Sequence, residues 1–569
     1  MQHRHLVPFV FSLLLAVPAC SDDPGTGTGG TGGEGGTGGE GGTGGEGGTG
    51  GTGGTGGTGG TGGPDRTVEE QVAERLEEIR DDHEAVQAFV LGMPKGGDLH
   101  SHTSGAVTPE SMIAWGAADG ACIDTTTFVA SSGPCADGAV PIADALDDQA
   151  LYDSIVQAWS MEDFMGTLLE GHQHFFDSFG KFGGVLIDSR SDDMVAQVRS
   201  TAGKNNQVYV ELMQGFGSGT AGTLAEAAML DDDVWDEPYL LEKRAEILED
   251  PGFDAAIDAA KASIESSLSG SDTLLDCGTP MADPGCNVDV RFLVAANRTR
   301  TRAYVFGQWV FAFELAQVVP EIVGVNLVSP EENANSLRYY NDEMLALSVL
   351  DRFNEEDATR TPVHVGLHAG ELIPDVLPMT PEGQMELDYH IRNAVEIAHA
   401  ERIGHGVDAL GEMAGDGADD LLSDMARMGV MVEICLTSND ALLDVEGREH
   451  PLKQYMAKNV PVALSTDDQG ILRIDITHEY VRAVEEQGLT YPQLKKIART
   501  SLEHAFLAGE SLWKTRDDFS ALVDECASDS PGETPSAGCD AFLRANDKAR
   551  IQWRHESATS AFEEATVSP

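Results

Sequence analysis

The chain has 569 residues and is strongly acidic, with 95 Asp and Glu against 36 Lys and Arg and a formal net charge of −59. This charge repels phosphates, so it argues against nucleic acid or an anionic membrane face as a partner and against a heavily phosphorylated substrate. Outside the N-terminal region no low-complexity linker interrupts the chain, which favours one large domain with insertions.

Residues 1–20 have the features of an export signal. Arg4 supplies the positive charge, and the apolar segment Leu6 to Val17 is too short to span a membrane. Cys20 follows a small-residue cleavage region and resembles the lipobox cysteine of bacterial lipoproteins. We therefore expect an exported protein of the bacterial cell envelope, lipid-anchored through Cys20 in the outer membrane or periplasm. Secretion with an incidental cysteine is the alternative.

Residues 21–64 are a Gly- and Thr-rich repeat without apolar residues large enough to build a core. This composition predicts a flexible tether between a lipid anchor and a folded body. The folded body is then residues 65–569, and the membrane would be contacted only through the lipid at Cys20.

Six of the eight cysteines form neighbouring pairs, and each pair brackets a polar loop containing Gly and Pro. The pairs are Cys122 with Cys135, Cys277 with Cys286, and Cys526 with Cys539. Local disulfides are the simplest interpretation, and they suit an oxidising compartment outside the cytosol. Cys435 is left over in an apolar run, where we expect a buried free thiol.

The body begins with a pattern typical of an amphipathic helix, from Thr67 to Leu91. Thr67 and Glu70 have capping-box spacing, and apolar residues recur at helical intervals after them. This helix could pack on its own domain or on the second subunit of a homodimer.

Short apolar runs then recur with helical patterns between them, and several are continuously apolar, as in parallel strands covered on both faces. The predicted strands are one leading into His100, then Gln207–Met213, Asp289–Ala296, Glu321–Val328, Thr361–His368, Arg402–Val407, Gly429–Leu436 and Val460–Thr466. The predicted helices include Ser336–Phe353, Gln384–Ala400 and Ala418–Met428. Eight strands predict an α/β fold, a (β/α)8 TIM-type barrel with helical and disulfide-loop insertions, the longest being Phe216–Asn287. A doubly wound open sheet is the alternative.

Four of these strands end in residues that bind metal ions or transfer protons. The residues are His100 and His102, His368 followed by Glu371, His405, and Asp467 with Asp468. Because all strands of a parallel barrel end on the same face, these side chains would converge. Three imidazoles and one carboxylate suit zinc, with a further position open for water.

The four motifs resemble those of the adenosine/AMP deaminase family of the metal-dependent amidohydrolase superfamily. They read His100-Ser101-His102, His368-Ala369-Gly370-Glu371, Arg402-Ile403-Gly404-His405-Gly406 and Ser465-Thr466-Asp467-Asp468. Met93 to Gly97 and Ala498 to Leu507 look like the secreted, growth-factor-related subgroup of adenosine deaminases and its bacterial relatives.

The resemblance implies hydrolytic deamination of adenosine or a related 6-aminopurine nucleoside, with one zinc ion per chain. The implied ligands are His100, His102, His368 and Asp467. Glu371 would protonate the purine ring nitrogen beside the reacting carbon, which requires a raised pKa in a dry pocket. His405 would act as base or orient the hydroxide that zinc activates, and Asp468 would accept from the other face of the ring.

The sequence departs from the family where the substrate would bind. Ser104 stands where family members have an aspartate that reaches the sugar, and Ser329 aligns with a glycine whose backbone amide meets the purine. Base chemistry is therefore better supported than sugar recognition. His364, on the same strand face as His368, is expected to be core packing.

Two other functions remain open. A related barrel hydrolase that cleaves an amide or ester is weakened because no strand ends in a lysine that could be carbamylated to bridge two metal ions. A lipid-anchored binding protein on a retired deaminase fold is the non-enzymatic alternative.

Overall fold

A computed structural model describes residues 66–409 and 418–568 of the chain. The export signal, Cys20 and the tether lie outside the described residues, so localisation remains a prediction. Val68–Pro569 forms one compact unit. Within the described ranges, no helix combines the length and apolarity that crossing a membrane requires.

Eight parallel strands form the central sheet, as the sequence predicted. In sheet order they are β1 (Gly97–His102), β5 (Tyr209–Gln214), β6 (Asp289–Asn297), β7 (Ile322–Val328), β8 (His364–Ala369), β9 (Arg402–His405), β10 (Met431–Ile434) and β11 (Val462–Leu464). A parallel bridge between Ser101 and Asp467 joins the two edges, and the Asp467 amide donates to the His100 carbonyl at 2.9 Å. The fold is therefore a (β/α)8 barrel.

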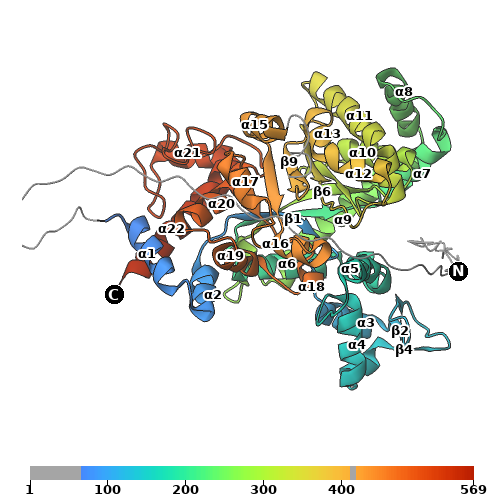
Figure 1. Cartoon of the computed structure of the whole chain (residues 1–569), viewed down its shortest axis with the longest axis horizontal. Coiled ribbons are helices and arrows are strands. Elements are labelled where there is room, and N and C mark those ends of the chain that lie inside the picture. The colour runs from blue at the N-terminus through green and yellow to red at the C-terminus, as the bar shows by residue number, and fades with distance from the viewer. Residues whose placement is uncertain (1–65, 410–417, 569) are drawn as a thin grey trace, which may run out of the picture. The chain divides into compact units, whose positions relative to one another are not determined.

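The strands are apolar on both faces because helices cover the outside of the barrel and side chains fill the inside. In β7 every residue but the last is buried. From the end of the β1–β5 segment onward the helices are α6 (Ser191–Lys204), α7 (Gly219–Ala228), α8 (Glu237–Leu248), α9 (Pro251–Leu274), α10 (Arg302–Leu315), α11 (Ala334–Glu356), α12 (Pro381–Gln384), α13 (His390–Glu396), α15 (Ala418–Met428), α16 (Leu436–Leu443), α17 (Leu452–Ala457), α18 (Gln469–Leu472), α19 (Ile476–Glu485), α20 (Tyr491–Glu503), α21 (Ala537–Ala545) and α22 (Asp547–Val567). Figure 1 shows many of them around the strands.

Two predicted helices differ from the structure. The N-terminal pattern forms two helices, α1 (Val68–Ile79) and α2 (His83–Gly92), because Asp82 caps α2 by accepting from the Ala85 amide at 3.2 Å. The pattern at residues 384–400 yields only the short α13, preceded by α12 and a 3-10 turn.

Helices α1 and α2 pack on their own chain. The Phe89 ring lies edge-on to Tyr491 at 6.1 Å and to Phe562 at 5.3 Å between centroids. Arg80 donates to the Val484 carbonyl at 2.9 Å. The N-terminal helices therefore pack on their own domain, which is one of the two arrangements that the sequence left open. A homodimer remains a prediction.

The segment between β1 and β5, residues 103–208, contains a small domain that the sequence did not reveal. Besides α6 it holds α3 (Pro109–Asp119), α4 (Gln149–Trp159), α5 (Leu168–Phe182) and an antiparallel sheet of β3 (Ala130–Ser131), β2 (Cys122–Asp124) and β4 (Ala139–Pro141). Its apolar core includes Val407, Leu442 and Ile471, which follow β9, β10 and β11. This β1–β5 insertion therefore covers the carboxyl ends of those strands.

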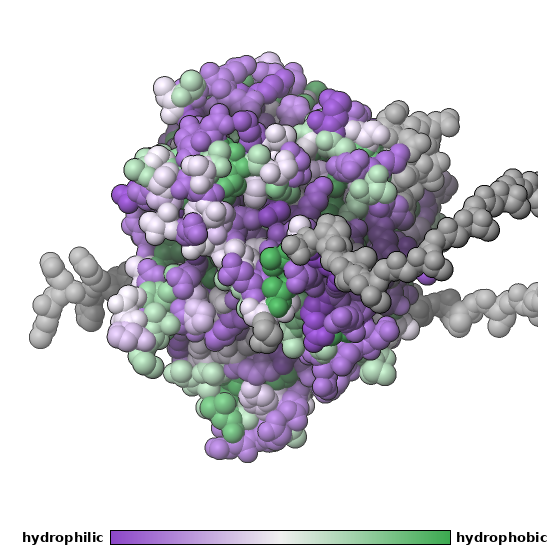
Figure 2. Space-filling view, turned by 90° about the vertical axis from the view of Figure 1, so that its left-hand side faces the viewer, coloured by the Kyte–Doolittle hydropathy of each residue, from purple (hydrophilic) through white to green (hydrophobic). Residues whose placement is uncertain are grey.

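The three predicted disulfides are confirmed, with S–S distances of 1.95, 1.98 and 2.03 Å. The pair Cys277–Cys286 closes a loop in the long insertion between β5 and β6, where α7, α8 and α9 also lie. Cys435 is buried and free, as expected. On the face shown in Figure 2 hydrophilic residues predominate and hydrophobic ones are scattered, in keeping with the acidic composition.

Candidate metal and catalytic site

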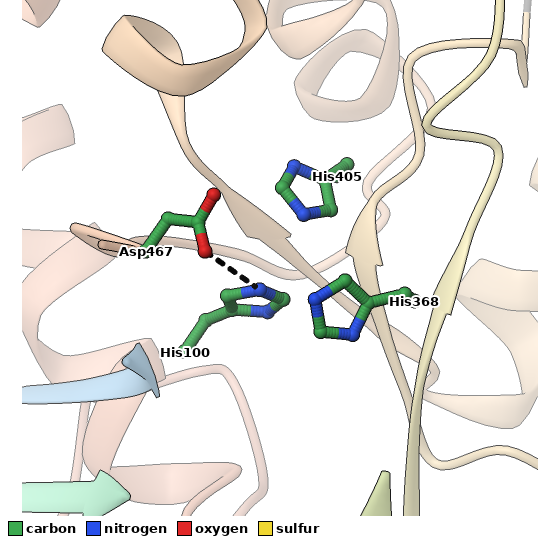
Figure 3. A group of neighbouring side chains, drawn as sticks. All are labelled: His100, His368, His405 and Asp467. Carbon is green, nitrogen blue, oxygen red and sulfur yellow. Dashed lines mark ion pairs between the residues drawn. The ribbon is translucent and has the colours of Figure 1, made fainter. Parts of the chain in front are cut away.

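The barrel brings the chemically active strand ends together at one place. His100 and His102 end β1, His368 lies near the end of β8, and His405 ends β9, while Asp467 follows β11. Figure 3 shows His100, His368, His405 and Asp467 with their side chains directed toward one another. Ligand-type atoms of these four side chains all lie within 4.8 Å of one another, so the cluster can hold a metal ion.

Three distances among the sequence-predicted ligands are compatible with one shared ion, but the four-residue cluster within 4.8 Å contains His405 in place of His102, and His102 is grouped with Asp467 and Asp468. His102 Nε2 lies 3.2 Å from both His368 Nε2 and Asp467 Oδ1, and His100 Nε2 lies 3.7 Å from Asp467 Oδ1. Ligands about 2.1 Å from a tetrahedral zinc ion are about 3.4 Å apart. Asp467 is oriented by Ser438, whose hydroxyl donates to Oδ2 at 2.7 Å.

Neighbouring acceptors orient two of the imidazoles. Nδ1 of His100 lies 2.6 Å from Glu433 Oε2, and Nδ1 of His368 lies 2.7 Å from Asn326 Oδ1. An imidazole that donates through Nδ1 keeps its Nε2 lone pair for a metal. His100 Nε2 is buried and lacks a hydrogen-bond partner among the described residues. This is expected of a nitrogen whose lone pair is kept for a metal ion.

Glu371 lies beside this cluster on a tight turn. Gly370 has φ +72, and a Cβ there would come within 2.7 Å of the Ile391 side chain, so the turn needs glycine. Glu371 Oε1 lies 3.6 Å from His405 Nε2. Burial, then the charge of Asp467, raises the pKa of Glu371 well above its usual range. A carboxyl group whose pKa is raised in this way is better suited to act as a general acid than an ordinary glutamate.

Glu331 holds the turn that carries Glu371, and motif reasoning missed it. Its carboxylate accepts from the amides of Gly370 at 3.1 Å and Glu371 at 2.9 Å, and from His390 Nδ1 at 2.6 Å. Arg298 Nη1 lies 3.5 Å away. Although burial opposes ionisation, Arg298 and His390 lower the pKa of Glu331 to about 2, so it is a carboxylate at neutral pH. Arg298 and Glu331 both closely follow predicted strands, and that position was the available signal.

Three site residues have left-handed backbone conformations that non-glycine residues rarely adopt. The φ angles are 65° at His405, 57° at Asp467 and 84° at Ser329. Such conformations cost about 1–3 kcal/mol each and cluster at functional sites. Gly404, beside His405, permits close approach, because a Cβ there would lie 2.5 Å from the His100 ring.

The three residues predicted to contact the substrate differ in their burial and hydrogen bonding. Asp468 is buried against Gly105, where any Cβ would overlap its carboxylate, and burial raises its pKa well above the usual range. The Ser329 carbonyl accepts from Arg298 Nε at 2.5 Å. Ser104 is half-buried in the loop after β1.

His364 is not core packing, contrary to expectation. Its side chain is 35% exposed, bonds Glu401 through Nδ1 at 2.7 Å and stacks on Phe506. It begins β8, so it lies at the opposite end of that strand from His368.

The fold and this cluster define a (β/α)8 barrel protein with a candidate metal site at the carboxyl ends of its strands. The family model described as "Adenosine deaminase" matches residues 272–520. That segment contains His368, Glu371, His405 and Asp467 and begins after β1.

The chain also matches curated adenosine deaminases. Adenosine deaminase of Escherichia coli (strain SMS-3-5 / SECEC) is 34% identical over 159 residues, which are 28% of this chain and 42% of that protein. The chain thus spans about two fifths of the length of the curated relatives it matches. Over residues 272–520 the chain is therefore similar to the adenosine deaminase family.

Solved structures were also matched. An adenine deaminase from Arthrobacter aurescens aligns at 18% identity with a TM-score of 0.45, over 73% of this chain and 94% of that one. An amidohydrolase from Burkhoderia ambifaria with bound Zn aligns at 14% identity with a TM-score of 0.46, over 74% of this chain and 88% of that one.

Proposed function

We propose that the protein is a zinc-dependent deaminase that hydrolyses adenosine or a close 6-aminopurine nucleoside to the 6-oxo product and ammonia. The observation that carries the proposal is the buried Glu371, whose pKa is raised by burial and whose Oε1 lies 3.6 Å from His405 Nε2 beside the candidate metal cluster. A zinc site alone serves many hydrolases, whereas an acid aimed into the site suits attack on a ring carbon whose neighbouring nitrogen needs a proton.

One zinc ion per chain is proposed at His100, His102, His368 and Asp467. Nitrogen and oxygen donors of this kind are the set that zinc prefers. The ion would supply hydroxide at neutral pH by lowering the pKa of water.

The remaining steps belong to the chain's own groups. As hydroxide adds to the amino-bearing carbon, Glu371 gives its proton to the adjacent ring nitrogen. Asp468 contacts the ring from the other side, and the β1–β5 insertion keeps water away from the site. The added hydroxyl then loses its proton, the amino group takes up that proton and leaves as ammonia, and the 6-oxo purine remains.

A substrate panel tests this proposal. Purified, metal-loaded protein would be incubated with adenosine, 2′-deoxyadenosine, 5′-modified adenosines, adenine and AMP, and ammonia would be measured. Release from a nucleoside is expected, and the panel defines the sugar, for which Ser104 gives no carboxylate. Absence of ammonia from all five, with zinc bound, would contradict a deaminase and leave an amide or ester hydrolase or a binding protein.

We also propose that the mature protein is exported and held at the cell envelope by lipid on Cys20. Three disulfides within the body support an oxidising compartment. Cys20→Ser should move the protein from the membrane fraction to the soluble one, and unchanged fractionation would refute the anchor.

A further inference from the structure

A chain of buried hydrogen bonds runs behind His405. The Leu452 amide donates to His450 Nδ1 at 3.2 Å, His450 Nε2 lies 3.0 Å from Asn439 Oδ1, and Asn439 Nδ2 lies 3.0 Å from His405 Nδ1. His450, Asn439 and His405 are at most 1% exposed. The chain links α17 and α16 to the end of β9.

The direction of each bond follows from its first member. A backbone amide can only donate, so His450 Nδ1 accepts and the proton of the neutral ring is on Nε2. Burial lowers the pKa of His450 to about 3, which keeps this ring neutral. His450 Nε2–H therefore donates to Asn439 Oδ1, which turns the amide nitrogen of Asn439 toward His405. His405 Nδ1 must accept, and the proton of its ring lies on Nε2.

That proton faces the reaction site. His405 Nε2 is buried, has no hydrogen-bond partner among the residues described, and lies 3.6 Å from Glu371 Oε1. We propose that Asn439 and His450 are positioning residues that hold His405 in its Nε2–H tautomer, so that His405 orients the attacking oxygen by donating a hydrogen bond and does not serve as the base. In this tautomer no lone pair of His405 faces the cluster, which also separates it from the metal ligands. The catalytic consequence rests on the proposed function; the tautomer does not.

Nitrogen-15 NMR of histidine-labelled, zinc-loaded protein reads the tautomer without measuring activity. His405 resonances are assigned by their loss in His405→Gln, and they should show a proton on Nε2 and none on Nδ1. In Asn439→Asp a carboxylate replaces the amide donor, so Nδ1 of His405 should become protonated. His504 is an internal control: Arg516 donates to its Nδ1 at 2.8 Å and its Nε2 meets Asp517 at 2.9 Å, so its signals should not change.

Two variants at 450 separate positioning from simple packing. His450→Gln can still donate to Asn439 and should keep the wild-type tautomer, whereas His450→Leu cannot and should show partial protonation of Nδ1. Removal of one oriented donor costs about 10²–10³-fold in kcat. The kcat of Asn439→Asp should therefore fall by that order with little change in KM. The kcat of His450→Gln should stay closer to the wild-type value than that of His450→Leu.

The outcomes are distinct. A wild-type His405 protonated on Nδ1, or an Asn439→Asp variant with the wild-type tautomer, would overturn the proposed positioning of His405 by Asn439 and His450. A changed tautomer with unchanged kcat would overturn the donor role. If the predicted tautomers are found but the protein deaminates no nucleoside, the positioning of His405 is supported and the proposed function is refuted.

Discussion

The carboxylate of Glu331 offers a sharp test of how the site is held together. Its two oxygens accept hydrogen bonds from the backbone amides of Gly370 and Glu371. The same carboxylate also contacts His390 and Arg298. In Glu331→Gln the amide NH2 must replace one oxygen, so either orientation turns a donor toward other donors. Removing one partner of a buried charge pair costs about 3–5 kcal/mol.

We therefore expect the free energy of unfolding, measured by urea titration, to fall by about that amount. Displacing Glu371 by about 1 Å should lower kcat by about 10²-fold, while zinc content should stay unchanged, because Glu371 is not one of the proposed ligands. Glu332→Gln is the matched control on the same loop: burial raises the pKa of Glu332 to about 7, so loss of its charge should not lower the free energy of unfolding. A Glu331→Gln protein with wild-type stability and kcat would refute this account of the turn.

Three further predictions follow from the same site and core. Glu371→Gln removes the transferable proton and should lower kcat by about 10²–10⁴-fold with zinc retained; a near-wild-type rate would exclude Glu371 as the acid. His100→Ala should lose zinc and activity together, and full zinc occupancy by metal analysis would place the site elsewhere. Burial raises the pKa of Glu343 well above its usual value, and neither of its oxygens has a hydrogen-bond partner among the described residues. Because the folded state then binds the extra proton, stability falls as pH rises above the unfolded pKa. The gain in unfolding free energy from Glu343→Gln should therefore grow as pH rises above about 5, by up to about 1.4 kcal/mol per unit; a gain independent of pH would contradict this.

The barrel was predictable because its strands are covered on both faces and read as unbroken apolar runs. The break between α1 and α2 was not apparent from periodicity, since apolar residues continue on both sides of it; Asp82 was the overlooked capping signal. The small sheet in the β1–β5 insertion escaped detection because its strands have only two or three residues, too few to show an alternating pattern.

The metal-ligand candidates could be found from sequence because each lies at or beside a strand end, where barrel geometry makes distant residues converge. Their supporting groups could not be assigned in this way. Arg298 and Glu331 also follow strands, but their partners are set by side-chain directions that no local pattern reveals. Asn439 and His450 lie on the α16 side of the site, and their link to His405 depends on the orientation of one amide.

The most direct test of the central claim is deamination measured against zinc content. Metal-stripped protein would receive increasing amounts of zinc while ammonia release from adenosine is followed. The account predicts negligible activity without metal and a rise that reaches its plateau at about one equivalent per chain, as expected for a single tetrahedral site. Full activity in the stripped protein, or a plateau only at two equivalents, would contradict a single zinc held by His100, His102, His368 and Asp467.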